Sequence, residues 1–541
     1  MPTEPMANTV ARVAESRPEQ ERLLEGDWNE FRVEGAALAA GPETGSAGNP
    51  PPAPRLKPIN RAQLQWRVVD VEKLVSATHP VRAIWELTGR LDLSRFYAGI
   101  GAVEGVAGQA TLQPRLLISL WIYAYSQGIS SAREVSRRCD YQPAFQWLTG
   151  MEKINHHTLS DFRVGHGAAL DELFQEVLAV LSAMDLVRMK RVTQDGTKIR
   201  AQASRETFRR EGKIRAHLEL AAQQIAAMGD PREEEASRRV KKARERAVRE
   251  RKQRLELALE QLEQVRASKK SGEEKAAARV SETEPEARIM PLSEGGFAPA
   301  YNVQISADAA EDLIVGVEVS QCSGDHRELI PAVERMEAKL GQKPEQVVAD
   351  GGYTNRENIL EMHAQQVELI GSLGEEEARS RSQLQRRGVS EEFRPNAFVW
   401  EEAANRYCCP AGKILSYEGK KEQPGCTQFL YRAKPADCLA CVHCQQCCPQ
   451  SATHGRMLVR TVEHPVVVQF REKMETEQAK QIYRERARIA EFPHAWIKDK
   501  LGLRRFRVRG LAKVRMEALW ACLTYNIQQW IRLRWKLQWA Q

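Results

Sequence analysis

The order of predicted elements indicates a mixed α/β protein, in which a helical region precedes a sheet with helices packed on it. Between residues 191 and 373, segments that favour extended backbone alternate with helical patterns, in the order strand, strand, strand, helix, strand, helix, strand. On either side, apolar residues recur at helical spacing, from about Ile59 to Leu186 and again from about Thr476. The 541 residues allow roughly three or four structural units and a sizeable core.

The N-terminal part divides into a tail and a helical domain. Residues 1–58 are rich in Gly, Ala and Pro and hold too little apolar surface to offset the cost of ordering, so we expect a flexible tail. Residues 59–185 form the helical domain, and two capping boxes mark helix starts in it: Ser131 with Glu134, and Thr158 with Asp161.

Short helices with polar turns would suit a helix-turn-helix-like DNA-binding domain. Its arginines would contact phosphates: Arg133, Arg137, Arg138 and Arg163. A plain helical bundle with solvated arginines is the alternative.

The predicted strands are short segments whose β-branched residues favour extended backbone. The first is RVTQDGTKIRA, beginning at Arg191. After a charged interval come YNVQISAD, LIVGVEVS, QVVAD and QVELIGSL, with a helical pattern from about His326 to Leu340 before the fourth strand. Asp195 therefore lies inside the first strand, and Asp350 ends the fourth.

The interval between the first two strands, residues 205–290, has a charge-rich helical pattern. It predicts an antiparallel helical hairpin inserted into the sheet domain, with a solvated charged surface. An apolar seam runs along it: Leu255, Leu259, Leu262 and Val265.

Residues 375–480 lose the strand and helix rhythm and hold eight of the eleven cysteines, so we interpret them as a cysteine-rich insertion. Thiolate pairs from two separate turns suit tetrahedral zinc, which would order such a segment. The expected zinc ligands are Cys409, Cys438, Cys441 and either Cys444 or Cys447.

Two alternatives to zinc stay open. The run from Cys438 to Cys448, followed by Pro449, also has the C-x-x-C-x-x-C-x-x-x-C-P spacing of bacterial ferredoxins, and the segment could hold no metal. The isolated cysteines lie in apolar contexts and are predicted to be core residues: Cys139, Cys322 and Cys522.

The net charge of +8 favours a polyanionic partner. Residues 481–541 carry fourteen Lys/Arg against four Asp/Glu, a net of +10, so the basicity is concentrated there. A cationic surface of this kind neutralises phosphates. The residues expected to form it are Arg504, Arg505, Arg507, Arg509 and Lys513.

Aromatic residues accompany this basic segment. They could stack on bases, although helical spacing is more typical of core residues. They are Trp520, Trp530, Trp535 and Trp539. The chain has no run of about 18 apolar residues and no secretory signal, so we expect no membrane partner and a cytoplasmic location.

Three acids stand out against this background. A carboxylate on a buried strand is costly unless it is paired or binds a metal, which makes Asp195 and Asp350 conspicuous. Glu491 lies on a predicted helix, in YRERARIAEFPHAWIK. Carboxylates from two strands and one helix can hold two hard cations about 3.5–4 Å apart, which activate a water or a 3′-hydroxyl.

The segments around these acids resemble a known family. TQDGTKIRA, VVADGGYTNRENI and the Y-x-x-R-x-x-x-x-E-x-x-x-x-x-x-K run resemble, in order, the catalytic signatures of insertion-sequence DDE transposases with an RNase H-like core. The likeness covers roughly residues 59–535, and TLSDFR, SETEPEARIMP and RFRVRGLAKVRMEALWACLTYNI extend it. Together these segments resemble the cysteine-containing branch numbered eleven eighty-two.

The resemblance implies an RNase H-like fold whose core falls into two parts, residues 186–374 and 481–541. It implies metal-dependent cleavage of DNA ends and strand transfer, with Asp195, Asp350 and Glu491 holding two Mg²⁺ or Mn²⁺ ions. The partners would be double-stranded DNA, as transposon ends and target, and further copies of the chain on that DNA. The location would be a bacterial cytoplasm, at the nucleoid.

The same resemblance gives Tyr483, Arg486 and Lys498 the role of positioning the glutamate helix and contacting the transposon end. The chain departs from the family pattern here, because four residues rather than three separate Arg486 from Glu491, and His494-Ala495 stand where Phe-Gly is common. Two other functions stay open: an RNase H-like nuclease without strand transfer, and an iron–sulfur DNA-binding or redox protein whose acidic trio is incidental.

Overall fold

The computed structural model describes residues 64, 66, 68–101, 110–227, 238–374 and 382–539. The predicted tail, residues 1–58, lies outside the described residues. The chain divides into two units, Met1–Val68 and Val69–Gln541, and the architecture below is that of the second unit.

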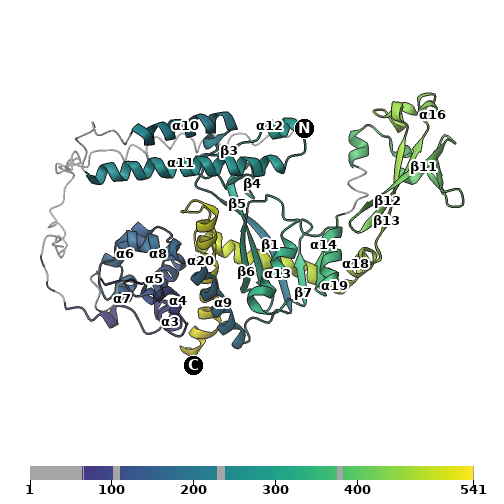
Figure 1. The fold of residues 1–541 in the computed structure, drawn as a ribbon. Coiled ribbons are helices and arrows are strands. Elements are labelled where there is room, and N and C mark those ends of the chain that lie inside the picture. Colours follow the sequence, from purple (N-terminus) through teal and green to yellow (C-terminus); the bar gives the residue numbers. More distant parts are fainter. Residues whose placement is uncertain are drawn as a thin grey trace, which may run out of the picture. The chain divides into compact units, whose positions relative to one another are not determined.

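Seven helices form the N-terminal part of this unit among its described residues (Figure 1). They are α3 (Pro80–Thr88), α4 (Ser94–Tyr97), α5 (Pro114–Ser126), α6 (Ala132–Tyr141), α7 (Pro143–Thr149), α8 (His156–Gly165) and α9 (Gly167–Ala183). The first predicted capping box is confirmed, because the Ser131 side chain accepts a hydrogen bond from the Glu134 backbone N–H. The second is wrong: Asn155 caps α8, and Thr158 lies inside that helix.

The central sheet has the predicted sequence of elements. Its strands are β1 (Arg191–Arg200), β4 (Arg288–Pro291), β5 (Phe297–Asp308), β6 (Ile314–Ser320), β7 (Gln346–Ala349) and β8 (Glu368–Gly371). The order is β5-β1-β7-β8, with β4 and β6 both pairing with the outer edge of β5. Strands β1, β7 and β8 are parallel, whereas β5 is antiparallel to each of its neighbours β1, β4 and β6. The short strand β4 was not predicted.

Helices cover both faces of this sheet. On one face lie α13 (Leu329–Leu340) and α14 (Arg356–Ala364), whose apolar residues join the main core. On the other face lies α19 (Glu477–Ala495), where Ala479 and Ile482 pack against Val348 and Ile370. Thr476 caps α19, at the predicted helix start.

The helix α20 (Leu511–Trp530) joins the sheet to the N-terminal helices (Figure 1). It contacts β6 on one side and α5, α8 and α9 on the other. The Asn526 amide accepts from the Ile314 N–H at 2.9 Å and donates to the Ile314 carbonyl at 2.8 Å. Trp520, Trp530 and Trp535 are buried, so for these three the core interpretation holds.

Between β1 and β4 the chain forms a helical pair. The antiparallel strands β2 (Phe208–Arg209) and β3 (Val280–Ser281) close its base. The helices are α10 (Glu211–Ala227), α11 (Arg238–Ala267) and the short α12 (Gly272–Ala276). Their separate core includes two of the four predicted seam residues, Leu255 and Leu262, with Leu259 and Val265 partly buried against it.

A second, antiparallel sheet fills much of the predicted cysteine-rich segment, in the order β13-β12-β11-β10-β9. Its strands are β9 (Val399–Glu401), β10 (Arg406–Cys408), β11 (Ile414–Gln423), β12 (Cys426–Ala433) and β13 (Met457–Glu463). The short helices α16 (Pro435–Leu439) and α17 (Cys444–Cys447) separate β12 from β13, and α18 (Pro465–Glu475) follows. This sheet was not predicted, because β11 exposes most of its residues and therefore lacks an apolar alternation.

Two predictions about single residues are wrong. Arg163, expected at a phosphate surface, is only 6% exposed and faces the buried Glu517 of α20 at 3.8 Å. Cys322, expected in the core, is exposed, whereas Cys139 and Cys522 are buried as predicted.

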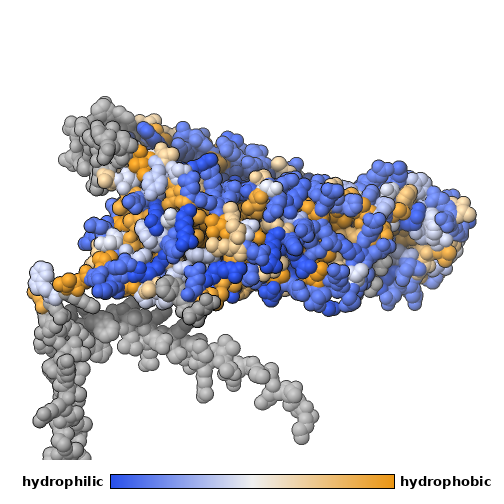
Figure 2. Space-filling model, turned by 90° about the horizontal axis from the view of Figure 1, so that it is seen from below, coloured by the Kyte–Doolittle hydropathy of each residue, from blue (hydrophilic) through white to orange (hydrophobic). Residues whose placement is uncertain are grey.

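None of the described helices is long and apolar enough to cross a membrane. On the face seen in Figure 2, hydrophilic residues predominate and hydrophobic ones are interspersed among them.

Candidate active site and basic surface

Asp195 lies on β1, and Asp350 directly follows the neighbouring parallel strand β7. β1 and β7 pair in register up to Gln194 opposite Ala349, so the next residue along each chain segment is an aspartate. Because side chains alternate between the two faces of a strand, both aspartates belong to the face of Val348, which α19 covers. Adjacent strands are about 4.8 Å apart, so the two carboxylates can reach one cation.

The surroundings of Asp195 disfavour its charge. Burial raises the pKa of its carboxyl to about 6, and the charge of Asp350 adds to this rise. A hydrogen bond from the Gly196 N–H at 2.8 Å and the charge of Arg486 act in the opposite direction. Two carboxylates that repel each other at a partly buried position fit a divalent cation, which would remove the repulsion.

Glu491, the third predicted acid, lies apart from this pair. It is exposed on α19, while its neighbours Ile489 and Ala490 are buried. No group of three His, Cys, Asp or Glu side chains among the described residues is arranged to hold a metal ion. Arg488, which precedes Glu491 by three residues on α19, pairs with Asp312 at 3.1 Å. The structure thus brings two of the three predicted acids together.

His494 is the residue of α19 that faces Asp195. Its Nε2 lies 3.7 Å from Asp195 Oδ2, and the ring is almost fully buried. Burial lowers the pKa of His494 to about 3, with the charges of Lys498 and Lys198 adding to the shift. The imidazole is therefore neutral, and its contact with Asp195 is not an ion pair. The sequence marked this histidine only as a departure from the family pattern and gave it no role.

The other predicted residues of this helical segment also lie near Asp195. Arg486 is half-buried and lies over the ring of Tyr483, at 5.6 Å from its centroid. Lys498 lies on a π-helical turn (Trp496–Lys500) that continues α19, and burial lowers the pKa of its ammonium group. Two cations beside the aspartate pair can hold a phosphate against it.

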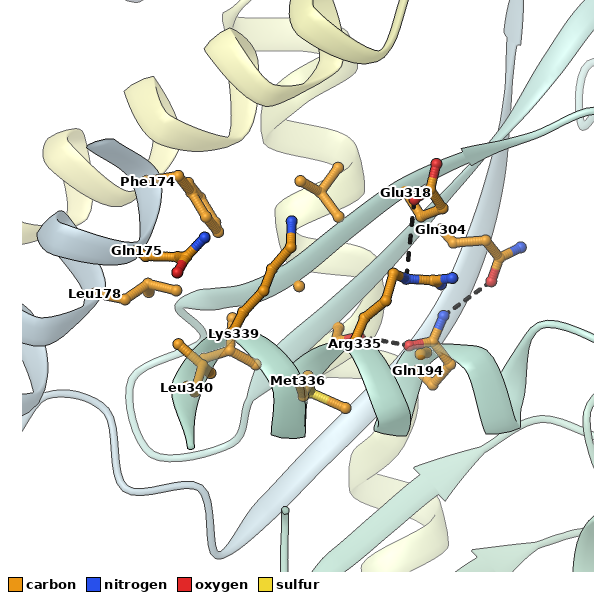
Figure 3. Close-up of a pocket in the computed structure, with 15 residues that line it drawn as sticks. Phe174, Gln175, Leu178, Gln194, Gln304, Glu318, Arg335, Met336, Lys339 and Leu340 are labelled. Carbon is orange, nitrogen blue, oxygen red and sulfur yellow. Dashed lines mark hydrogen bonds and ion pairs between the residues drawn. The ribbon is translucent and has the colours of Figure 1, made fainter. Parts of the chain in front are cut away.

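On the opposite face of β1, a polar network fixes the strand (Figure 3). The Gln194 amide donates to Gln304 at 2.8 Å and accepts from Ser306 at 2.6 Å. Figure 3 shows this pair beside Arg335 and Glu318, in a pocket that side chains of α9 and α13 complete. This pocket lies on the face away from Asp195, so it supports the site from behind.

Asp325 extends that network towards the site. It accepts from Lys198 at 3.2 Å, from Asn302 at 2.6 Å and from Gln304 at 2.8 Å. Gly196 leaves room for these groups, because a Cβ there would lie 2.5 Å from the Gln304 amide nitrogen and 2.7 Å from an Asp325 oxygen. The sequence did not reveal this network, since its members come from separate strands and loops.

The segment before α20 attaches the basic surface to the end of β1. The Arg200 N–H donates to the Arg504 carbonyl at 3.2 Å, and the Phe506 N–H donates to the Arg200 carbonyl at 2.9 Å. Arg504 pairs with Glu294 at 2.9 Å and with Asp499 at 2.5 Å. The remaining predicted cations are exposed and have no ion-pair partner among the described residues: Arg505, Arg507, Arg509 and Lys513.

All five predicted zinc ligands line one pocket of the second sheet domain, together with Cys448 and His443. They are Cys409, Cys438, Cys441, Cys444 and Cys447. The Cys438 sulfur accepts from the Arg456 N–H at 3.3 Å, and the Cys409 sulfur accepts from the Lys413 N–H at 3.2 Å. The buried Arg456 guanidinium donates to the Cys447 and Phe393 carbonyls, and its Nε has no hydrogen-bond partner.

Comparison with known sequence families gave two matches. The family described as "Transposase domain (DUF772)" matches residues 69–164, which hold the helices α3 to α8. The family described as "Transposase DDE domain" matches residues 408–531, which hold most of the cysteine pocket, α19 and α20. A search of curated proteins found no match. Two transposase families thus match separate parts of the chain, and these matches indicate a DDE transposase of the insertion-sequence type.

Proposed function

We propose that this transposase cleaves the ends of an insertion sequence and joins them to target DNA, using divalent ions held by Asp195 and Asp350. The juxtaposition of these two aspartates on β1 and β7 carries the proposal. Glu491 is proposed as the third acid, which would approach the pair from α19 when DNA is bound. Two bound Mg²⁺ or Mn²⁺ ions would activate a water or the 3′-hydroxyl of the DNA as the nucleophile and would stabilise the leaving oxygen.

The sheet topology supports an RNase H-like core. Its continuous order β6-β5-β1-β7-β8 combines an antiparallel half with a parallel half, and Asp195 lies on the central strand β1 while Asp350 follows the end of β7 beside it. We propose that residues 186–374 and 481–541 form this core around the helical pair of residues 205–290 and the cysteine-rich segment of residues 375–480. The membership of the branch numbered eleven eighty-two is part of the same proposal.

The chain's own side chains would bind and orient the DNA. Arg486 and Lys498 flank the aspartates, where each can neutralise a phosphate of the cleaved strand. Tyr483 holds the guanidinium of Arg486 by a cation–π contact. The exposed basic segment, with Arg504 to Lys513, would extend this surface along the duplex, and the helical domain of residues 59–185 would add contacts to the end sequence. Several copies of the chain would assemble on the DNA.

The cysteine pocket is proposed as a structural zinc centre. Among the described residues, the buried Arg456 has no carboxylate partner, and it lies next to six thiols. An anionic thiolate group there would compensate its charge. Elemental analysis should find about one zinc per chain, and Cys438→Ser with Cys441→Ser should lower that content. Iron in the amount of one iron–sulfur cluster per chain, with absorbance near 400 nm, would indicate the ferredoxin-like alternative. A protein that contains neither zinc nor iron would refute both metal hypotheses.

The function is tested by Asp195→Asn and Asp350→Asn. Each removes an anionic oxygen from the proposed metal site, so both should abolish end cleavage and strand transfer in a gel assay with labelled ends, while DNA binding persists. Glu491→Gln should do the same. Full cleavage by a folded Asp195→Asn protein would contradict the proposal, and cleavage without strand transfer by the wild type would identify a nuclease.

A further inference from the structure

His494 has a buried ring without a hydrogen-bond partner. Its exposed fraction is 8%, and neither ring nitrogen has a partner among the described residues. Buried polar groups are nearly always satisfied, so a side chain with two unsatisfied nitrogens needs an explanation. The nearest charged oxygen is Asp195 Oδ2, at 3.7 Å from Nε2.

The distance to Asp195 is too long for a hydrogen bond. It suits two ligands of one cation, because ligands about 2.0–2.2 Å from an ion stand roughly 3–3.7 Å apart at neighbouring positions.

The helical phase of α19 explains why His494 holds this place. Each residue turns an α-helix by about 100°, so Glu491, one residue after the buried Ala490, is rotated away from the buried side and is exposed. Ala490 occupies the inward position instead, and His494, four residues later, lies on the same face. α19 therefore presents an imidazole, and not its carboxylate, to Asp195.

We propose that His494 Nε2 is a ligand of the divalent cation held by Asp195. This inference rests on the proposed function, since it concerns the same metal site. Imidazole is a ligand of transition-metal ions, whereas Mg²⁺ prefers oxygen. The ligand set thus favours Mn²⁺ over Mg²⁺ at this position.

Pulsed electron paramagnetic resonance of Mn²⁺ bound to the full chain tests this directly. The wild type should show coupling to a directly bound nitrogen, and labelling with ¹⁵N-histidine should change that signal. His494→Ala should abolish the coupling and weaken Mn²⁺ binding at least about tenfold. The matched control is His363→Ala, which removes an exposed imidazole on α14 and should change neither.

Two aspartate variants distinguish failure of the His494 assignment from failure of the proposed metal site. If Asp195→Asn and Asp350→Asn lower Mn²⁺ affinity but the wild type shows no nitrogen coupling, the His494 assignment is overturned while the metal site stands. Coupling that persists in His494→Ala also overturns it. Unchanged Mn²⁺ affinity in the aspartate variants, or no Mn²⁺ binding by the wild type, would overturn the proposed metal site as well. The isotope experiment needs only wild-type protein, so misfolding of His494→Ala would not leave the inference unchecked.

Discussion

Arg163→Met should destabilise the contact between α8 and α20 by about 3–5 kcal/mol at neutral pH, because it leaves a buried carboxylate without its cation. Glu517 is 1% exposed and lies 3.8 Å from the Arg163 guanidinium. Its other hydrogen-bond partners in the described part of the chain are the N–H groups of Arg507 at 2.8 Å and Val508 at 3.2 Å. Methionine retains much of the arginine's apolar volume, so the lost charge dominates the effect.

The penalty should depend on pH. Burial raises the pKa of Glu517, and Arg163 opposes this rise, so its removal should raise the pKa further. A carboxyl with a raised folded-state pKa loses stability as the pH increases from its ordinary value through the raised one. The cost of Arg163→Met should therefore be small near pH 4 and grow with pH, and it should level off above the raised pKa of Glu517, where the carboxyl is ionised in the folded protein as well.

Hydrogen exchange of α20 amides, measured from pH 5 to 8 and corrected for intrinsic rates, reports this local stability. Arg137→Met is the matched control, because its partner Glu134 is at the surface and such pairs contribute about 0–1 kcal/mol. The double variant Arg163→Met with Glu517→Met should recover much of the loss. A cost below about 1 kcal/mol for Arg163→Met at pH 7, without pH dependence, would refute the reasoning.

Three further outcomes follow. Replacing Arg505, Arg507 and Arg509 by Ala should weaken DNA binding and reduce the slope of log affinity against log salt concentration by about one per lost contact. An unchanged slope would show that these arginines do not contact DNA phosphates. Gly196→Ala should lower both the melting temperature and the rate of end cleavage, because three polar atoms would lie within 2.9 Å of the new Cβ. A variant with the melting temperature of the wild type would contradict the predicted clash. Asp195→Asn should stabilise the metal-free protein at pH 7 by at most about 3 kcal/mol, because burial raises the pKa of Asp195 to about 6 and its ionisation therefore costs stability as the pH rises. A melting temperature below that of the wild type would contradict this prediction.

The central sheet and its helices were predictable because their signals are local. Strand β1 and the hairpin of β5 and β6 carry β-branched runs bounded by turns, and α19 begins at the predicted Thr476 cap. The position of Asp195 inside its strand, and of Asp350 at the end of the run that forms β7, followed from the same runs. By contrast, β11 and β13 of the second sheet expose many of their residues and carry no clear apolar period.

The sequence by itself determined the element order, the concentration of basic residues near the C-terminus and the two strand aspartates as candidates. Only the tertiary structure decided which side chains meet. It paired Arg163 with Glu517, which lie more than three hundred residues apart, and so made a supposed phosphate contact part of the core. It also turned His494 rather than Glu491 towards Asp195, because the burial of one face of α19 against the sheet fixes the rotation of the helix, and a one-residue shift in spacing moves a side chain by about 100°.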